Sequence, residues 1–100
     1  LSGSNCGMTV VLKGHIDVPA ERLDAVRAAL PEHIRLTRAE EGCLRFDVTE
    51  SAEPVGRFEV SEAFTTPAAF KAHQARGAQS AWADVTKGIA RRYNIEGLEQ

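Results

Sequence analysis

The sequence predicts an α+β domain in which an antiparallel sheet follows the split βαβ pattern. Two observations support this prediction. Apolar and polar residues alternate with the period of a strand over residues 8–16, 44–49, 57–64 and 91–98. Apolar residues at helical spacing fill the intervals after the first and the third of these strands. The resulting order of strand, helix, strand, strand, helix, helix, strand is that of the ferredoxin-like arrangement.

The first helix is expected to begin at Pro19, because a proline in the first helical position loses no hydrogen bond. Apolar residues recur at helical spacing from Leu23 to Leu30. Pro31 is expected to kink or break this helix unless the chain restarts there. Gly42 is a typical residue to end it.

Two more helices are predicted in the second half of the chain. Thr66 is a typical N-cap and precedes a first-turn proline, so a helix is expected over residues 67–77. Trp82, Val85 and Ile89 share the spacing of one further helix before the last strand.

The length of 100 residues is that of a single domain. Residues 1–7 have no periodicity and are rich in small polar residues. We therefore expect a disordered tail or an expression remnant at 1–7, and one domain over residues 8–100.

The composition argues against two classes of partner and favours one cellular compartment. A net charge of −2 and a pI near 5.9 argue against a nucleic-acid partner, and no apolar run is long enough for a membrane span. Two cysteines and no visible secretion signal favour a cytoplasmic protein. The sequence has neither a glycine-rich phosphate loop nor metal-ligand spacing, so it predicts no cofactor and no metal.

Glu62 and His73 are the candidate catalytic residues. Glu62 lies on the apolar face of its predicted strand. It could be an acid or base that lines a pocket and has a raised pKa, or a structural hydrogen-bond acceptor. His73 follows Phe70 by three residues on one helix face, where it could move a proton near neutral pH or bond a backbone carbonyl. His15 and His33 are expected at the surface.

Four aromatic side chains are expected to enclose an apolar cavity between the sheet and the helices, namely Phe46, Phe64, Phe70 and Trp82. Ordinary core packing is the alternative for Phe46 and Phe70. Trp82 combines a large ring with a hydrogen-bond donor, so it suits the wall of a site for a planar ligand.

Three segments resemble the antibiotic biosynthesis monooxygenase (ABM) family in their order and spacing: EGCLRFDV at 41–48, EAF at 62–64 and FKAH at 70–73. The resemblance extends over roughly residues 8–98. It implies a homodimer in which two sheets pair face to face as a dimeric α/β barrel. It also implies cofactor-free oxygenation of an electron-rich aromatic such as a quinol or an anthrone, with Glu62 at the pocket and His73 at the family's histidine position.

Other members of the same fold remain as alternatives. The string at 40–48 and the segment RRYN at 91–94 also resemble the autoinducer-2 phosphate isomerase branch, but the second histidine of that branch is absent from 74–78. Haem-degrading relatives carry an asparagine on the first strand and a histidine after the tryptophan, and this chain has neither. A non-catalytic dimer that binds a small ligand would need the pocket but no proton transfer.

Overall fold

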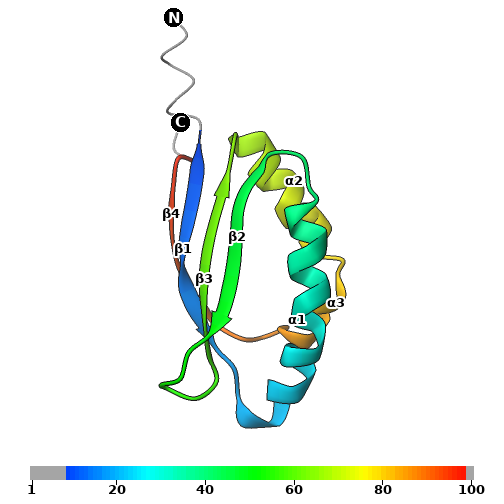
Figure 1. Ribbon diagram of the computed structural model, residues 1–100, viewed down its shortest axis with the longest axis vertical. Coiled ribbons are helices and arrows are strands. Elements are labelled where there is room, and N and C mark those ends of the chain that lie inside the picture. Colours follow the sequence, from blue (N-terminus) through cyan, green and yellow to red (C-terminus); the bar gives the residue numbers. More distant parts are fainter. Residues whose placement is uncertain (1–8, 99–100) are drawn as a thin grey trace, which may run out of the picture.

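A computed structural model of the chain describes residues 9–98, and Figure 1 shows a sheet with its helices packed on one face. The elements are β1 (Val10–Asp17), a 3₁₀ turn (Ala20–Arg22), α1 (Leu23–Arg38), β2 (Cys43–Glu50), β3 (Arg57–Phe64), α2 (Pro67–Gly77), α3 (Ala81–Val85) and β4 (Arg91–Glu96). The four strands pair antiparallel in the order β2-β3-β1-β4. The predicted ferredoxin-like fold is therefore confirmed. The predictions for residues 1–7 and for Met8 lie outside the described residues.

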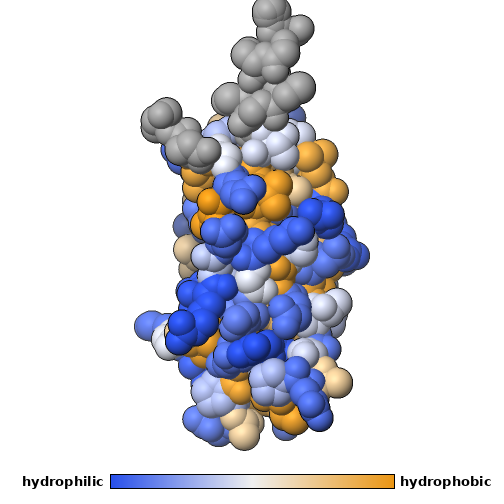
Figure 2. Space-filling view, turned by 90° about the vertical axis from the view of Figure 1, so that its left-hand side faces the viewer, coloured by the Kyte–Doolittle hydropathy of each residue, from blue (hydrophilic) through white to orange (hydrophobic). Residues whose placement is uncertain are grey.

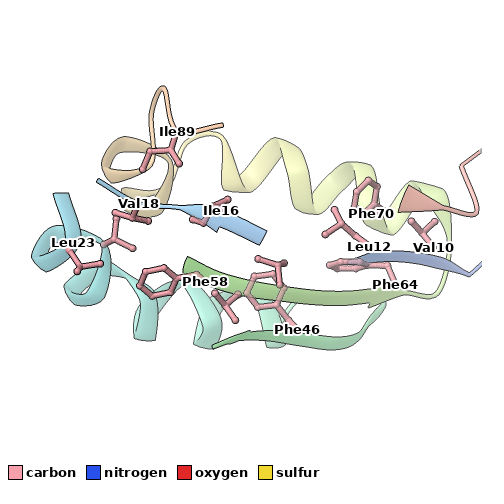
Figure 3. Close-up of a cluster of buried hydrophobic side chains, with 13 residues drawn as sticks. Val10, Leu12, Ile16, Val18, Leu23, Phe46, Phe58, Phe64, Phe70 and Ile89 are labelled. Atoms are coloured by element: carbon pink, nitrogen blue, oxygen red, sulfur yellow. The ribbon is translucent and has the colours of Figure 1, made fainter. Parts of the chain in front are cut away.

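The core lies between the sheet and the helices (Figure 3). Phe64 of β3 and Phe70 of α2 pack at one end of it, with ring centroids 5.7 Å apart. Phe58, Val18 and Leu23 gather at the other end (Figure 3). Burial of each phenylalanine contributes about 2 kcal/mol to the stability of the fold. None of the helices in residues 9–98 is long and apolar enough to cross a membrane.

The helix α1 is continuous through Pro31, so the expected break at this residue does not occur. The helix ends at Arg38, before Gly42, which lies in the connection to β2. Gly42 has a φ of +89°, and a Cβ atom at this position would lie 2.6 Å from the Cβ of Ala69. A glycine is therefore required for the connection to lie against α2.

The helix α3 is shorter than the spacing predicted. It ends at Val85, and Ile89 lies in the loop that follows, buried in the core. The guanidinium of Arg22 donates hydrogen bonds to the carbonyl oxygens of Val85 and Lys87, at 2.6 Å each. These bonds satisfy carbonyl groups that a longer helix would have used.

Regular alternation over residues 44–49 would place Leu44 on the buried face of β2 with Phe46 and Val48. A β-bulge between Cys43 and Arg45 changes this arrangement. Phe46 and Val48 are buried, whereas Leu44 is 60% exposed.

Candidate functional site

A cavity of about 320 Å³ lies between the helix-facing side of the sheet and the helices. Its walls are mostly apolar, and polar groups enter it from four elements: His33 on α1, Glu62 on β3, His73 on α2 and Tyr93 on β4. A largely apolar cavity with a few convergent polar groups is the usual form of a small-molecule site.

Five of the six side chains predicted for the site line this cavity: Glu62, His73, Phe46, Phe70 and Trp82. Phe64 is not among the lining residues. It is fully buried in the core, and its ring stacks on that of His73 with centroids 4.9 Å apart. Phe64 therefore packs against the imidazole of His73 and does not line the cavity.

Glu62 faces the helices from β3, and its side chain is only 8% exposed. Within the described structure its Oε1 atom has no hydrogen-bond partner. The nearest ring nitrogen, Nε2 of His73, is 3.8 Å away, which is beyond hydrogen-bond length. Burial raises the pKa of Glu62 to about 7, and the negative charge of Glu40 acts in the same direction. Near neutral pH, Glu62 therefore exchanges readily between its protonated and ionised forms.

His73 projects from α2 with its two ring nitrogens in different surroundings. Nδ1 lies 2.9 Å from Oε1 of Glu40, while Nε2 points toward Glu62 on the cavity side. Because a carboxylate can only accept, Nδ1 donates, and Nε2 of the neutral ring keeps its lone pair. Burial lowers the pKa of His73, against the opposing effect of Glu40. The arrangement presents a neutral base to the cavity.

Glu40 and Arg76 were missed by the sequence reasoning. Arg76 donates to Oε2 of Glu40 through Nε, and to Oγ1 of the buried Thr37 through Nη2 at 3.0 Å. Arg76 follows His73 by three residues on α2, so both side chains reach the same carboxylate from one helix face. Glu40 lies in a connection without periodicity. The sequence reasoning included it only as the first residue of the string at 40–48 and assigned it no role.

His33 was expected at the surface, and this expectation is wrong. The residue is buried and lines the cavity, and its ring stacks on Trp82 with centroids 5.1 Å apart and planes 6° apart. Burial lowers the pKa of His33 to about 4, so the ring is neutral at pH 7. Because α1 continues through Pro31, His33 lies seven residues after the buried Val26 on one helix face. That spacing was present in the sequence.

The edge strand β4 adds Tyr93 and Arg91 to the cavity lining, while Arg92 is absent from it. Burial raises the pKa of Tyr93, so its hydroxyl stays protonated at pH 7. Gly14 faces Tyr93 across the β1–β4 pair, and a Cβ atom on Gly14 would lie 2.8 Å from Cδ1 of the tyrosine ring. The glycine thus leaves room for the ring beside the cavity. Across residues 9–98, no group of three or more His, Cys, Asp and Glu side chains is placed to hold a metal ion.

The sequence model of the antibiotic biosynthesis monooxygenase family matches residues 9–85. The chain belongs to this family. An antibiotic biosynthesis monooxygenase from Nitrosomonas europaea, itself assigned provisionally, is 26% identical to this ABM protein with a TM-score of 0.74, over 88% of this chain and 95% of that one. A provisionally assigned one from Deinococcus radiodurans is 23% identical with a TM-score of 0.75, over 91% and 93% of the two chains. The comparison with curated proteins gave no match.

Proposed function

We propose that this ABM protein is a cofactor-independent monooxygenase that acts on a small, electron-rich aromatic such as a quinol or an anthrone. The observation that supports the proposal most directly is the neutral Nε2 of His73, which faces Glu62 inside an apolar cavity. The family to which the chain belongs supports the class of reaction.

The cavity suits a planar ring. Trp82 and His33 form one stacked wall, and the ring of Phe46 lies edge-on to His33 at 5.3 Å. Aromatic walls favour offset stacking and edge-to-face contacts with a flat ligand. They also keep water from the reacting carbon, which protects a carbanion.

His73 would act as the base. Its Nε2 removes a proton from the activated carbon or hydroxyl of the substrate. The carbanion reduces dioxygen and a carbon–oxygen bond forms, giving a peroxide. The returned proton converts the peroxide to a hydroperoxide. The O–O bond then breaks as the same carbon loses its second hydrogen as a proton: one oxygen stays on the substrate as a carbonyl, and the other leaves as water with these two protons. Protonated Glu62 would donate a hydrogen bond to a substrate oxygen, because its raised pKa of about 7 keeps the acid form available.

Oxygen uptake tests the proposal. Chelator-treated protein, without added flavin or nicotinamide, is mixed with anthrone or 1,4-naphthoquinol in air. We expect oxygen consumption and anthraquinone formation from anthrone at a rate well above autoxidation. The absence of any rate above autoxidation with both compounds would contradict the proposed substrate class. Loss of activity on chelation, restored by one metal, would contradict the cofactor-free mechanism.

The alternatives give different outcomes in the same series of experiments. Trp82 is the single tryptophan of the chain, so quenching of its fluorescence by anthraquinone reports binding in the cavity. Binding without turnover would favour a ligand-binding protein. Isomerisation of a phosphorylated diketone would favour the isomerase branch.

A further inference from the structure

A second pocket, of about 540 Å³, lies on the other side of His73. The connection at residues 40–42 and the helix α2 form its walls, and Glu40, Arg76 and Thr66 line it. Glu62 lines only the inner cavity and Glu40 only this outer pocket, whereas His73 lines both. The imidazole of His73 is therefore part of the wall between them.

The four polar side chains along this line become progressively more exposed. The exposed fractions are 8% for Glu62, 9% for His73, 16% for Glu40 and 33% for Arg76. The contact from Nδ1 of His73 to Oε1 of Glu40 measures 2.9 Å, and Arg76 bonds the other carboxylate oxygen. The two ring nitrogens of His73 thus connect the buried cavity to a carboxylate beside solvent.

We propose that Glu40 is the proton exit of the site, carrying protons between His73 and the solvent of the outer pocket while a substrate fills the inner cavity. This inference rests on the proposed function. As Nε2 of His73 gains the substrate proton, its Nδ1–H bond breaks and an O–H bond forms on Glu40. The Glu40 acid then releases that proton to water in the outer pocket. The reverse transfers restore the Nδ1–H tautomer when His73 returns its proton to the peroxide and one oxygen of dioxygen leaves as water.

The groups around His73 favour proton transfer from its Nδ1 to Glu40. On the cavity side, Glu62 and His33 lie near the ring, and both face the volume that the substrate would occupy. Tyr93 and Arg91 of β4 line the same cavity. The ring of His33 lies 6.2 Å from that of His73, and burial keeps it neutral. Phe64 and Phe46 cover the imidazole at 4.9 and 5.6 Å. Within residues 9–98, Glu40 is the one acceptor bonded to the ring, and Arg76 holds it in place.

The test compares Glu40→Gln with the wild type. Glutamine keeps the shape and an acceptor oxygen but cannot take up a proton. Deuterium wash-in at the acidic carbon of anthrone, followed by NMR in anaerobic D₂O, measures proton transfer without oxygen. We expect the exchange rate to fall by about tenfold or more. Quenching of Trp82 by anthraquinone should be unchanged, because Glu40 does not line the inner cavity.

Two further variants and a substrate-free measurement accompany this test. Glu40→Asp keeps a carboxylate and should recover part of the exchange rate, and it serves as the informative variant if Glu40→Gln fails to fold. Glu32→Gln is the control, because Glu32 is exposed on α1 and pairs only with Arg35 among the contacts described. In ¹⁵N NMR, Glu40→Gln should lower the pKa of His73, because Glu40 raises it in the wild type.

The outcomes separate this proposal from the proposed function. Wild-type exchange in Glu40→Gln would overturn the proton exit even if oxygenation is confirmed. If the wild type exchanges the anthrone protons but consumes no oxygen, the proposed monooxygenase function is contradicted. A loss of exchange in Glu40→Gln would then still support Glu40 as the proton exit. If the wild type does not exchange anthrone at all, the NMR result decides: an unchanged pKa and tautomer of His73 in Glu40→Gln would overturn the exit, and a lowered pKa would support it.

Discussion

Glu62 and His33 are the two buried groups whose protonation should change the stability of the protein most. Burial raises the pKa of Glu62 from 4.5 to about 7, so the folded state keeps a proton that the unfolded state has released between these values. Stability due to Glu62 therefore falls as the pH rises through this window. Burial lowers the pKa of His33 from 6.5 to about 4, so the His33 contribution falls as the pH decreases from 6.5 to 4. The two effects oppose each other between pH 4.5 and 6.5, and only that of Glu62 remains above this range.

Glu62→Gln should stabilise the protein at pH 8 and have little effect at pH 5. At pH 8 the wild type pays the cost of a buried carboxylate, and glutamine removes that charge at nearly constant shape. The gain in unfolding free energy should be at most about 3 kcal/mol. Urea unfolding of both proteins at the two pH values measures it. Glu59→Gln, an exposed change on the same strand, is the control. An equal difference at both pH values would contradict the assignment of the raised pKa.

At the scale of elements, the helix ends place the site residues. Thr66 accepts a hydrogen bond from the backbone N–H of Ala69 at 3.0 Å and so fixes the start of α2, which carries His73 and Arg76. The continuity of α1 decides the position of His33, since a break at Pro31 would have rotated the rest of the helix away from the cavity. The position of His33 in the site thus depends on a helix with a proline in its interior, which is unfavourable for helix stability.

Pro31→Ala should stabilise the protein. Alanine restores the backbone N–H that can donate to the carbonyl of Arg27, one turn earlier, and a proline inside a helix costs about 3 kcal/mol. A gain of about 1–3 kcal/mol in urea unfolding is expected, because proline also restricts the unfolded chain. Pro67→Ala is the matched control: that proline occupies the start of α2, where it is favourable, so its replacement should be neutral or destabilising. A Pro31→Ala variant less stable than the wild type would contradict this account of α1.

At the scale of the whole molecule, the helices cover one face of the sheet and leave the other open. Figure 2 shows that this open side carries hydrophilic residues mixed with hydrophobic ones. Charged residues on it already pair within the chain, as Arg57 does with Asp17 at 2.8 Å. A partner sheet would therefore have to meet both apolar patches and charges.

The open face leads to a prediction about association. The family resemblance implies a dimer with two sheets face to face, and the charges of this face would then pair across a two-fold axis. Sedimentation equilibrium should report a dimer at micromolar concentration, weakened by high salt because exposed charges are screened. A stable monomer at these concentrations would remove the barrel interpretation.

Periodicity was sufficient to predict the four strands, although only β1 and β3 alternate regularly toward the core. A bulge interrupts the alternation in β2, and in β4 only Tyr93 is partly buried. Periodicity also identified Glu62, as a carboxylate among the buried apolar residues of β3. It could not identify Glu40, whose bond to His73 joins residues 33 positions apart through a connection without pattern. His33 was placed at the surface because a proline usually interrupts a helix. In the structure α1 continues through Pro31, since tertiary packing outweighs this local preference. Both errors therefore come from contacts between segments that are distant in the sequence, which a local pattern does not record.

The central claim is that His73 removes the substrate proton inside the cavity. Oxygen uptake with anthrone by His73→Ala, compared with the wild type, tests it most directly. His15→Ala is the matched control, since that histidine lies on β1 and does not line the cavity. We predict a fall of about 10²-fold or more for His73→Ala, with little change in unfolding free energy, and a wild-type rate for His15→Ala. A wild-type rate in His73→Ala would contradict the account.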